Sequence, residues 1–300
     1  MKKDFKYALK SVFEHMPLDE KERGKFPALK RLQDEMMGKS NSRKNPLADE
    51  AVWNTLISVG YWGKEGELYR TLTSDRKPVS DCRIIVEAQP KSPRKGSDYD
   101  ITEHREGNSH IDIVVGNVIR RTNYKGEDQK NGIAYAATPG GSVCFVESKL
   151  NSDISYRTKT SPLRNQMIRV IENLLTFQSA SIDITPRFPQ RLHFVLITPK
   201  MFKDNPNSRL YGFLMERYSS NNDPEALLEV IKKSTKSTVR DEENWVYPSK
   251  DEMLEQISHM RINWVTTEKI MKGIPNAGFK ETLFDLVKIT SEINSLIKLQ

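Results

Sequence analysis

The stretch VCFVESKLNSD, residues 143–153, decides the fold that we expect for this chain. Its first four residues are apolar, which is typical of a strand that is covered on both faces of a sheet. The strand ends with Glu147 and Lys149, whose side chains project to the same side because they are two positions apart. Burying both charges without compensation costs several kcal/mol for each ion, so we expect a function that requires them.

A second strand-like run, HIDIVV at residues 110–115, places Asp112 among β-branched residues. If the two strands are neighbours, Asp112 and Glu147 direct their oxygens toward one point. Two converging carboxylates repel each other, and a divalent cation removes that repulsion. Oxygen ligands with open water positions suit Mg²⁺ or Mn²⁺. Lys149 would then lie beside a metal-bound water, where it can orient or deprotonate the nucleophile.

These segments together resemble the PD-(D/E)XK nuclease superfamily. The resemblance rests on HIDIVV followed by SVCFVESKL, with a helix carrying Glu50 before them and the helix RNQMIRVIENLL after them. It covers residues 47–199, and Ile111 stands where the proline that gives the family its name would be. It implies an α/β fold with a restriction-endonuclease-like core, in which helices flank a mixed central sheet.

The same resemblance implies a set of roles for individual residues. Asp112 is the acid of the first half of the motif, Glu147 and Lys149 are the (D/E)XK pair, and the Ser148 carbonyl is a further metal ligand. The implied activity is that of a Mg²⁺-dependent endonuclease, with Mn²⁺ as a possible substitute, that acts on DNA. A restriction or phage-defence role in the cytoplasm would suit such an enzyme.

Two other positions are candidates through the same resemblance. Many relatives place another metal-binding carboxylate where Glu50 lies, although a glutamate in a first helical turn also complements the helix dipole. Asp49 and Glu87 are alternatives to Glu50. Gln166 resembles a family position that supports the site or contacts the substrate.

Basic residues in two polar segments are candidates for phosphate contacts. Residues 90–108 and 121–141 are too polar for a core, so we expect surface loops or hairpin extensions there. Cations in such loops can neutralise phosphates without recognising a particular base sequence. The alternative is that they are ordinary solvated surface charges with no role in binding. The residues concerned are Arg94, Lys95 and Arg121, together with Arg120 directly before the second segment.

The composition is compatible with this hypothesis. The 300 residues carry a net charge of +7, which modestly favours a polyanionic partner. No run of about 18 or more apolar residues occurs, so a membrane-spanning helix is not expected. The two cysteines have no CxxC spacing and indicate reduced structural residues, as in a cytoplasmic protein. Histidine spacing supports no zinc site, and no Gly-rich nucleotide-binding motif is present.

Hydrophobic periodicity predicts three parts of the chain: a helical segment at residues 1–44, the nuclease-like core at 45–200, and a mainly helical region at 201–300 that packs on the core. The helical flanks would mediate homodimerisation, substrate choice or docking to a partner protein. Within the core we expect a helix that ends at Gly60 and a helix after the motif. We expect strands at residues 67–73, 82–89, 109–119, 142–150 and 192–199.

Two other functions remain open from the sequence. A non-catalytic nucleic-acid-binding or assembly subunit could use the same fold, although such a protein needs none of Asp112, Glu147 and Lys149. A nuclease that acts on RNA would use the same residues on a different polymer.

Overall fold

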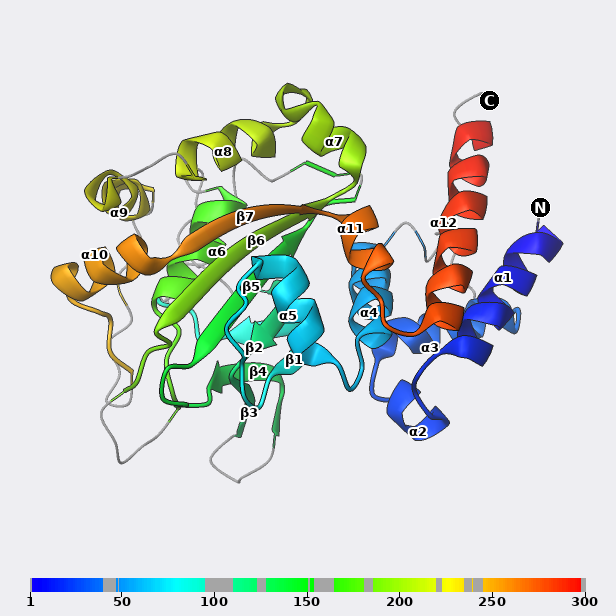
Figure 1. Cartoon of the computed structure of the whole chain (residues 1–300), viewed down its shortest axis with the longest axis horizontal. Coiled ribbons are helices and arrows are strands. Elements are labelled where there is room, and N and C mark those ends of the chain that lie inside the picture. The colour runs from blue at the N-terminus through cyan, green and yellow to red at the C-terminus, as the bar shows by residue number, and fades with distance from the viewer. Residues whose placement is uncertain are drawn as a thin grey trace, which may run out of the picture.

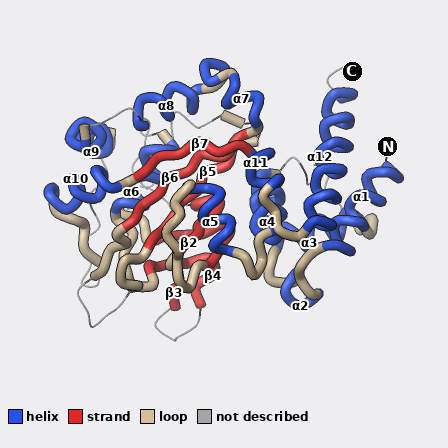
Figure 2. The backbone as a smooth tube through the Cα atoms, in the orientation of Figure 1, coloured by secondary structure: helices blue, strands red, loops and turns tan. Residues whose placement is uncertain are grey.

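The protein is an α/β protein with a seven-stranded mixed sheet flanked by helices (Figures 1 and 2). This computed structural model describes residues 2–39, 47, 49–94, 110–122, 128–150, 152–153, 165–180, 186–219, 223–234, 239 and 245–297. The architecture agrees with the α/β class that the sequence predicts. None of the helices in these ranges is both long enough and apolar enough to cross a membrane.

The sheet has the strand order β3-β4-β1-β2-β5-β6-β7. Strand β2 runs antiparallel to β1 and to β5, whereas β5, β6 and β7 are parallel to one another. Strand β4 pairs with β1 in parallel and with β3 in an antiparallel hairpin. The strands are β1 (Arg83–Pro90), β2 (Ile111–Gly116), β3 (Val118–Thr122), β4 (Asp128–Tyr135), β5 (Ser142–Ser148), β6 (Arg191–Thr198) and β7 (Arg261–Thr266).

Helices cover both faces of the sheet, each over its own apolar core. One core contains residues of α4 and α5 together with α1, α3 and α12, which in Figure 1 gather beyond the end of the sheet where β7 leads into α11. The other contains residues of α6, α8, α9 and α10. The helices are α1 (Lys2–His15), α2 (Glu20–Arg23), α3 (Pro27–Met36), α4 (Glu50–Gly60), α5 (Glu65–Thr73), α6 (Gln166–Leu175), α7 (Lys200–Asp204), α8 (Leu210–Ser219), α9 (Pro224–Lys233), α10 (Lys250–His259), α11 (Thr267–Lys272) and α12 (Ala277–Ile297).

Strand β5 lies at the centre of this arrangement. All of its residues are buried. Cys144 and Val146 pack into the core under α4 and α5, while Val143 and Phe145 pack into the core under α6. The near-continuous apolar run therefore marks a strand that is covered on both faces, as we predicted.

Helix α6 carries a side chain to the end of β5. The side chain of Asn165 caps the helix by accepting a hydrogen bond from the Ile168 backbone at 3.0 Å. Met167, Ile171 and Leu174 are fully buried, and their spacing places them on one face of the helix against the sheet. The first residue, Gln166, consequently lies close to the end of β5.

One predicted strand is wrong, because residues 67–73 belong to helix α5. The run ELYRTLT has β-branched and aromatic residues that favour a strand locally. Its buried positions, Leu68, Tyr69, Leu72 and Thr73, instead have helical spacing and pack against the sheet. Tertiary packing therefore outweighs strand propensity in this segment.

The strand predicted at residues 109–119 is divided into β2 and β3. Gly116 has a φ of +135°, and a Cβ there would collide with the Ser142 carbonyl of β5. Only glycine tolerates this conformation, so the chain leaves one strand and enters the next. The following hairpin is less polar than we expected, because Ile133, Ala134 and Tyr135 at the end of β4 are buried.

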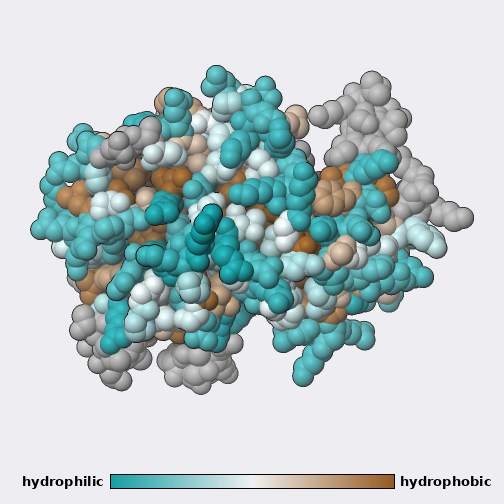
Figure 3. Space-filling model, viewed as in Figure 1, coloured by the Kyte–Doolittle hydropathy of each residue, from teal (hydrophilic) through white to brown (hydrophobic). Residues whose placement is uncertain are grey.

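The C-terminal region is mainly helical, but it also supplies β7, a strand that we did not predict. Strand β7 extends the sheet beside β6, and α12 packs against α1. Leu283 and Leu286 of α12 are buried in that contact layer. Figure 3 shows polar side chains over most of the molecular face that it draws, with apolar patches between them.

Candidate active site

The strand register brings Asp112 and Glu147 together. Strands β2 and β5 are antiparallel neighbours, and Ile113 pairs with Val146. One residue further along this register, Asp112 lies opposite Glu147. Oδ2 of Asp112 accepts a hydrogen bond from the backbone N–H of Ser148 at 2.7 Å, which anchors the carboxylate at the end of β5.

Lys149 lies among the carboxylates at this end of the strand. Its Nζ is 2.8 Å from Oε1 of Glu147 and 3.4 Å from Oε2 of Glu50. The side chain of Glu147 is fully buried, and that of Lys149 is 8% exposed. Glu147 and Lys149 therefore project to the same side, as their spacing predicts.

Glu50 joins the site from the first turn of α4. Its Oε1 accepts hydrogen bonds from the Leu150 backbone at 3.1 Å and from the Ser152 hydroxyl at 2.7 Å. The residue before it, Asp49, instead caps α4 and pairs with Arg31 at 2.5 Å. Of these two adjacent carboxylates, Glu50 is the one that contacts Lys149, while it also retains its place in a first helical turn.

Gln166 holds Glu147 from the other side. Its Nε2 donates a hydrogen bond to Oε1 of Glu147 at 2.5 Å. The second oxygen of Glu147, Oε2, is buried without a hydrogen-bond partner among the described residues, and so is the Ser148 hydroxyl. Buried polar atoms are normally hydrogen-bonded, so this carboxylate oxygen keeps a capacity to accept that the described residues do not use.

Glu87 extends the acidic pair to a third strand. Val86 pairs with Ile113 and Ala88 pairs with Ile111, so that Glu87 lies opposite Asp112. Its φ of +53° is uncommon for a non-glycine residue and breaks the regular alternation of β1. Glu87, Asp112 and Glu147 consequently form a row across β1, β2 and β5, which we name the acidic row.

Burial and mutual repulsion dominate the electrostatics of the acidic row. Burial raises the pKa of Asp112, and the Ser148 N–H and the Lys149 ammonium only partly oppose that effect. Burial and the charge of Asp112 raise the pKa of Glu147. Burial alone would lower the pKa of Lys149, but Glu147 and Glu50 raise it more. One ammonium cannot neutralise several carboxylates, so without a further cation the acidic row favours taking up protons.

The chemistry of this donor set fits a hard divalent cation. Asp112 and Glu147 supply carboxylate oxygens, and the orphaned Oε2 of Glu147 has free lone pairs. Within the described residues, no three side chains of histidine, cysteine, aspartate or glutamate lie close enough to hold a metal ion. The Lys149 ammonium contacts Glu147 and Glu50 and supplies part of the neutralisation. The metal-binding roles of Ser148 and Glu50 remain predictions.

The basic residues that we expected on loops have different positions. Arg94 is only 6% exposed, and its guanidinium is hydrogen-bonded to Glu172, so the expectation of an open loop cation is wrong for this residue. Lys95 lies outside the described residues. Arg121 donates a hydrogen bond to the Gln89 carbonyl at 3.4 Å. Arg120 is exposed on β3 and lines a groove beside Glu87.

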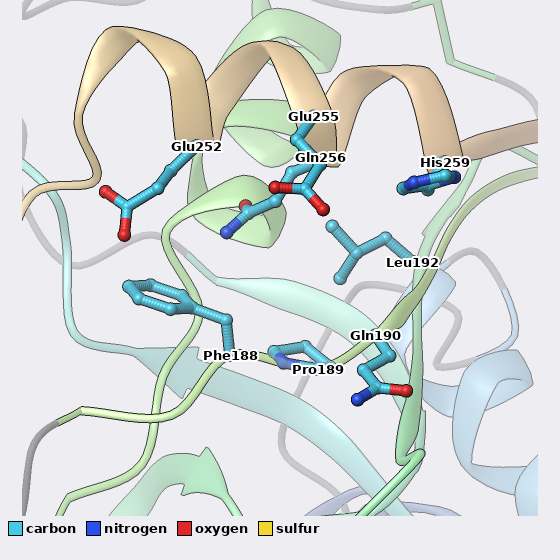
Figure 4. A pocket seen from close by; sticks show the side chains of 8 residues that line it. All are labelled: Phe188, Pro189, Gln190, Leu192, Glu252, Glu255, Gln256 and His259. Atoms are coloured by element: carbon cyan, nitrogen blue, oxygen red, sulfur yellow. The ribbon is translucent and has the colours of Figure 1, made fainter.

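A separate pocket of about 450 Å³ lies between α10 and the segment that leads into β6. Figure 4 shows Glu252, Glu255 and His259 of α10 facing a wall that includes Phe188. Glu252 is occupied in capping its own helix, because its carboxylate accepts a hydrogen bond from the Ser249 backbone at 2.7 Å. The pocket contains no member of the acidic row, so it is not a candidate for the same chemistry.

In comparisons with known proteins, the chain matched no protein-family model, no curated protein and no solved structure. The geometry of the site therefore carries the functional conclusion.

Proposed function

We propose that this chain is a metal-dependent nuclease that hydrolyses phosphodiester bonds in DNA. One observation carries the proposal: Asp112 and Glu147 lie opposite each other on neighbouring strands, with the Lys149 ammonium 2.8 Å from Glu147. The order α4, α5, β1, β2, β3, β4, β5, α6 and β6, in which a group of strands is followed by a helix and a further strand, supports the resemblance to the PD-(D/E)XK superfamily. A restriction or phage-defence setting rests on that resemblance.

Asp112 and Glu147 would hold Mg²⁺ or Mn²⁺, with the Ser148 carbonyl as a further ligand. A bound divalent ion lowers the pKa of water and offsets charge on the phosphate. The Lys149 ammonium, which Glu147 and Glu50 keep protonated, orients the attacking water and stabilises the charge that develops on the phosphate oxygens. Gln166 keeps Glu147 in position through its hydrogen bond, and Glu50 restrains Lys149.

The test is cleavage by the pure, full-length chain. Labelled single- and double-stranded DNA and RNA are incubated with Mg²⁺, with Mn²⁺ or with EDTA. We expect metal-dependent cleavage of DNA by the wild type and none by Asp112→Asn or Lys149→Met. The exposed pair Lys200 and Asp204 on α7 supplies matched controls, Lys200→Met and Asp204→Asn, which should cut at the wild-type rate.

Two outcomes would overturn the proposal. Cleavage that resists EDTA, or that survives Asp112→Asn undiminished, would remove the site assignment. Metal-dependent cleavage of RNA alone would change the substrate while keeping the site.

A non-catalytic nucleic-acid-binding subunit is the second candidate. It is favoured by the absence, in the described parts of the chain, of a preassembled group of three metal-ligating side chains. Binding of DNA without cleavage under any metal condition would select it.

A further inference from the structure

A groove of about 520 Å³ opens directly beside the acidic row. Residues of α3 and α4 form one wall, and residues of β1 and β3 form the other. Glu87 belongs both to this groove and to the acidic row, so the two sites are continuous. The volume lies within the range of roughly 300–1,000 Å³ that is usual for ligand sites.

The groove has a strong excess of positive charge. Its lining contains Lys25, Arg31, Arg83 and Arg120, all of them exposed, and Glu87 is the one carboxylate among the lining residues. Arg31 is additionally held in place by its ion pair with Asp49. That pair already offsets the charge of Arg31, so Lys25, Arg83 and Arg120 are the cations that can each neutralise a phosphate of a polyanionic chain.

Aromatic side chains lie within the same groove. Trp62 is 37% exposed, and its ring stands edge to face with that of Phe26, with 6.1 Å between the ring centroids. Trp62 follows the C-terminal end of α4, where its backbone N–H is bonded to the Val59 carbonyl at 3.0 Å. Half-buried Ile84, Val86 and Ile119 supply apolar lining. A fixed, partly exposed indole is a surface on which an unpaired base can stack.

We propose that this groove binds a single-stranded segment of nucleic acid next to the scissile phosphate. The segment's phosphates contact Lys25, Arg83 and Arg120, and one of its bases stacks on Trp62. Aromatic stacking requires an unpaired base, which a continuous duplex does not offer. This inference rests on the proposed function only for the place where the chain is cut, because binding in the groove requires no metal.

Binding is measured by fluorescence anisotropy in EDTA, with the full-length protein. The probes are a labelled single-stranded DNA, the RNA of the same sequence and the blunt DNA duplex. Each is about 12 nucleotides long, which is within the usual range of site sizes for single-strand binding. We expect both single strands to bind more tightly than the duplex, and the ratio of their affinities distinguishes DNA from RNA.

Substitutions in the groove test the individual contacts. Trp62→Ala should weaken single-strand binding at least about fivefold, whereas Trp62→Phe should retain most of it. Arg83→Ala and Arg120→Ala should each reduce the slope of log affinity against log salt by about 0.7. Phe213→Ala and Arg217→Ala, which remove exposed side chains of α8 on the other face, should change neither quantity. The thermal midpoint of each variant shows that it is folded.

The proposal that the groove binds a single strand would be overturned if Trp62→Ala and Arg83→Ala both bound single strands with wild-type affinity. It would also be overturned if the wild type bound the duplex and the single strands equally tightly. If Mg²⁺-dependent cleavage persists in that case, the nuclease proposal still stands. If binding depends on Trp62 but no cleavage occurs, the groove stands and the nuclease proposal fails.

Discussion

Two buried ion pairs of this protein are equally hidden from solvent, yet they differ in every other respect. One joins Arg94 to Glu172, and the other joins Lys149 to Glu147. In each pair the side chain of the cation is 8% exposed and the side chain of the acid is 0% exposed. Burial alone therefore does not distinguish a structural pair from a functional one.

The difference lies in how well the charges are satisfied. Oε1 of Glu172 receives two hydrogen bonds from Arg94, at 2.6 and 3.0 Å, and one from the Tyr247 hydroxyl at 2.8 Å. The guanidinium also lies over the Tyr247 ring, 5.5 Å from its centroid. Among the described residues, one oxygen of Glu147 has no hydrogen-bond partner, and the carboxylate faces further carboxylates. A satisfied buried pair stabilises the fold, whereas an unsatisfied one costs stability that a function must justify.

We expect the largest effect from a substitution that breaks the Arg94–Glu172 pair. Glu172→Gln should lower the free energy of unfolding by about 3–5 kcal/mol, because it leaves the Arg94 charge buried without its counter-ion. Urea denaturation at pH 7.5 measures this change. Nuclease activity per folded molecule should stay at the wild-type level, and a change smaller than about 1 kcal/mol would contradict the structural role of the pair.

The same substitution in the other pair should act on activity instead. Glu147→Gln should slow cleavage by about 10²–10³-fold, since it removes a charged group on which the transition state depends. In EDTA the free energy of unfolding should change by less than about 1 kcal/mol, because the pKa of Glu147 is already raised and glutamine resembles its protonated form. Comparable stability losses in Glu147→Gln and Glu172→Gln would erase the distinction between the pairs.

His193 on β6 tests whether an orphaned buried atom always marks a function. Its Nδ1 is buried without a partner among the described residues, yet it lies outside the acidic row. Burial lowers the pKa of His193 to about 4, against the opposing effect of Asp75. The neutral His193 imidazole therefore contributes fully to the free energy of unfolding above about pH 6.5, the pKa of an unfolded histidine. This contribution is lost as the pH falls from there toward 4.

The expected loss for His193 is on the order of 2–3 kcal/mol across that window. Unfolding free energies measured at pH 7.5, 6 and 4.5 should fall more steeply for the wild type than for His193→Gln. Parallel curves would show that His193 does not titrate with folding. Cleavage at pH 7.5 should be the same in both proteins.

The smallest effect concerns the neighbour that holds Glu147. Gln166→Leu should reduce the cleavage rate by about tenfold and leave stability nearly unchanged, since it removes one hydrogen bond to the carboxylate. Gln166→Asn is a second variant, whose shorter amide should not reach Glu147. A loss as large as that in Glu147→Gln would mean that Gln166 itself contacts the substrate.

Some features of this protein depend on residues that are close together in the chain. The apolar run before Glu147 predicts a strand with two covered faces, and the spacing of Glu147 and Lys149 predicts that they share one side. Asp112 within an Ile-rich run is visible in the same way. Strand periodicity and the cost of burying charge are local properties, so these residues could be selected without coordinates.

Other features depend on contacts between distant segments. The burial of Arg94 requires Glu172, which lies 78 residues away. Strand β7 has one residue classed as buried and exists because it pairs with β6. The place of Glu87 in the acidic row depends on a positive φ and on its register with β2. Sequence alone therefore determined which charges are unusual, and only the tertiary structure decided which of them meet, because partners distant in sequence meet only through strand pairing and packing.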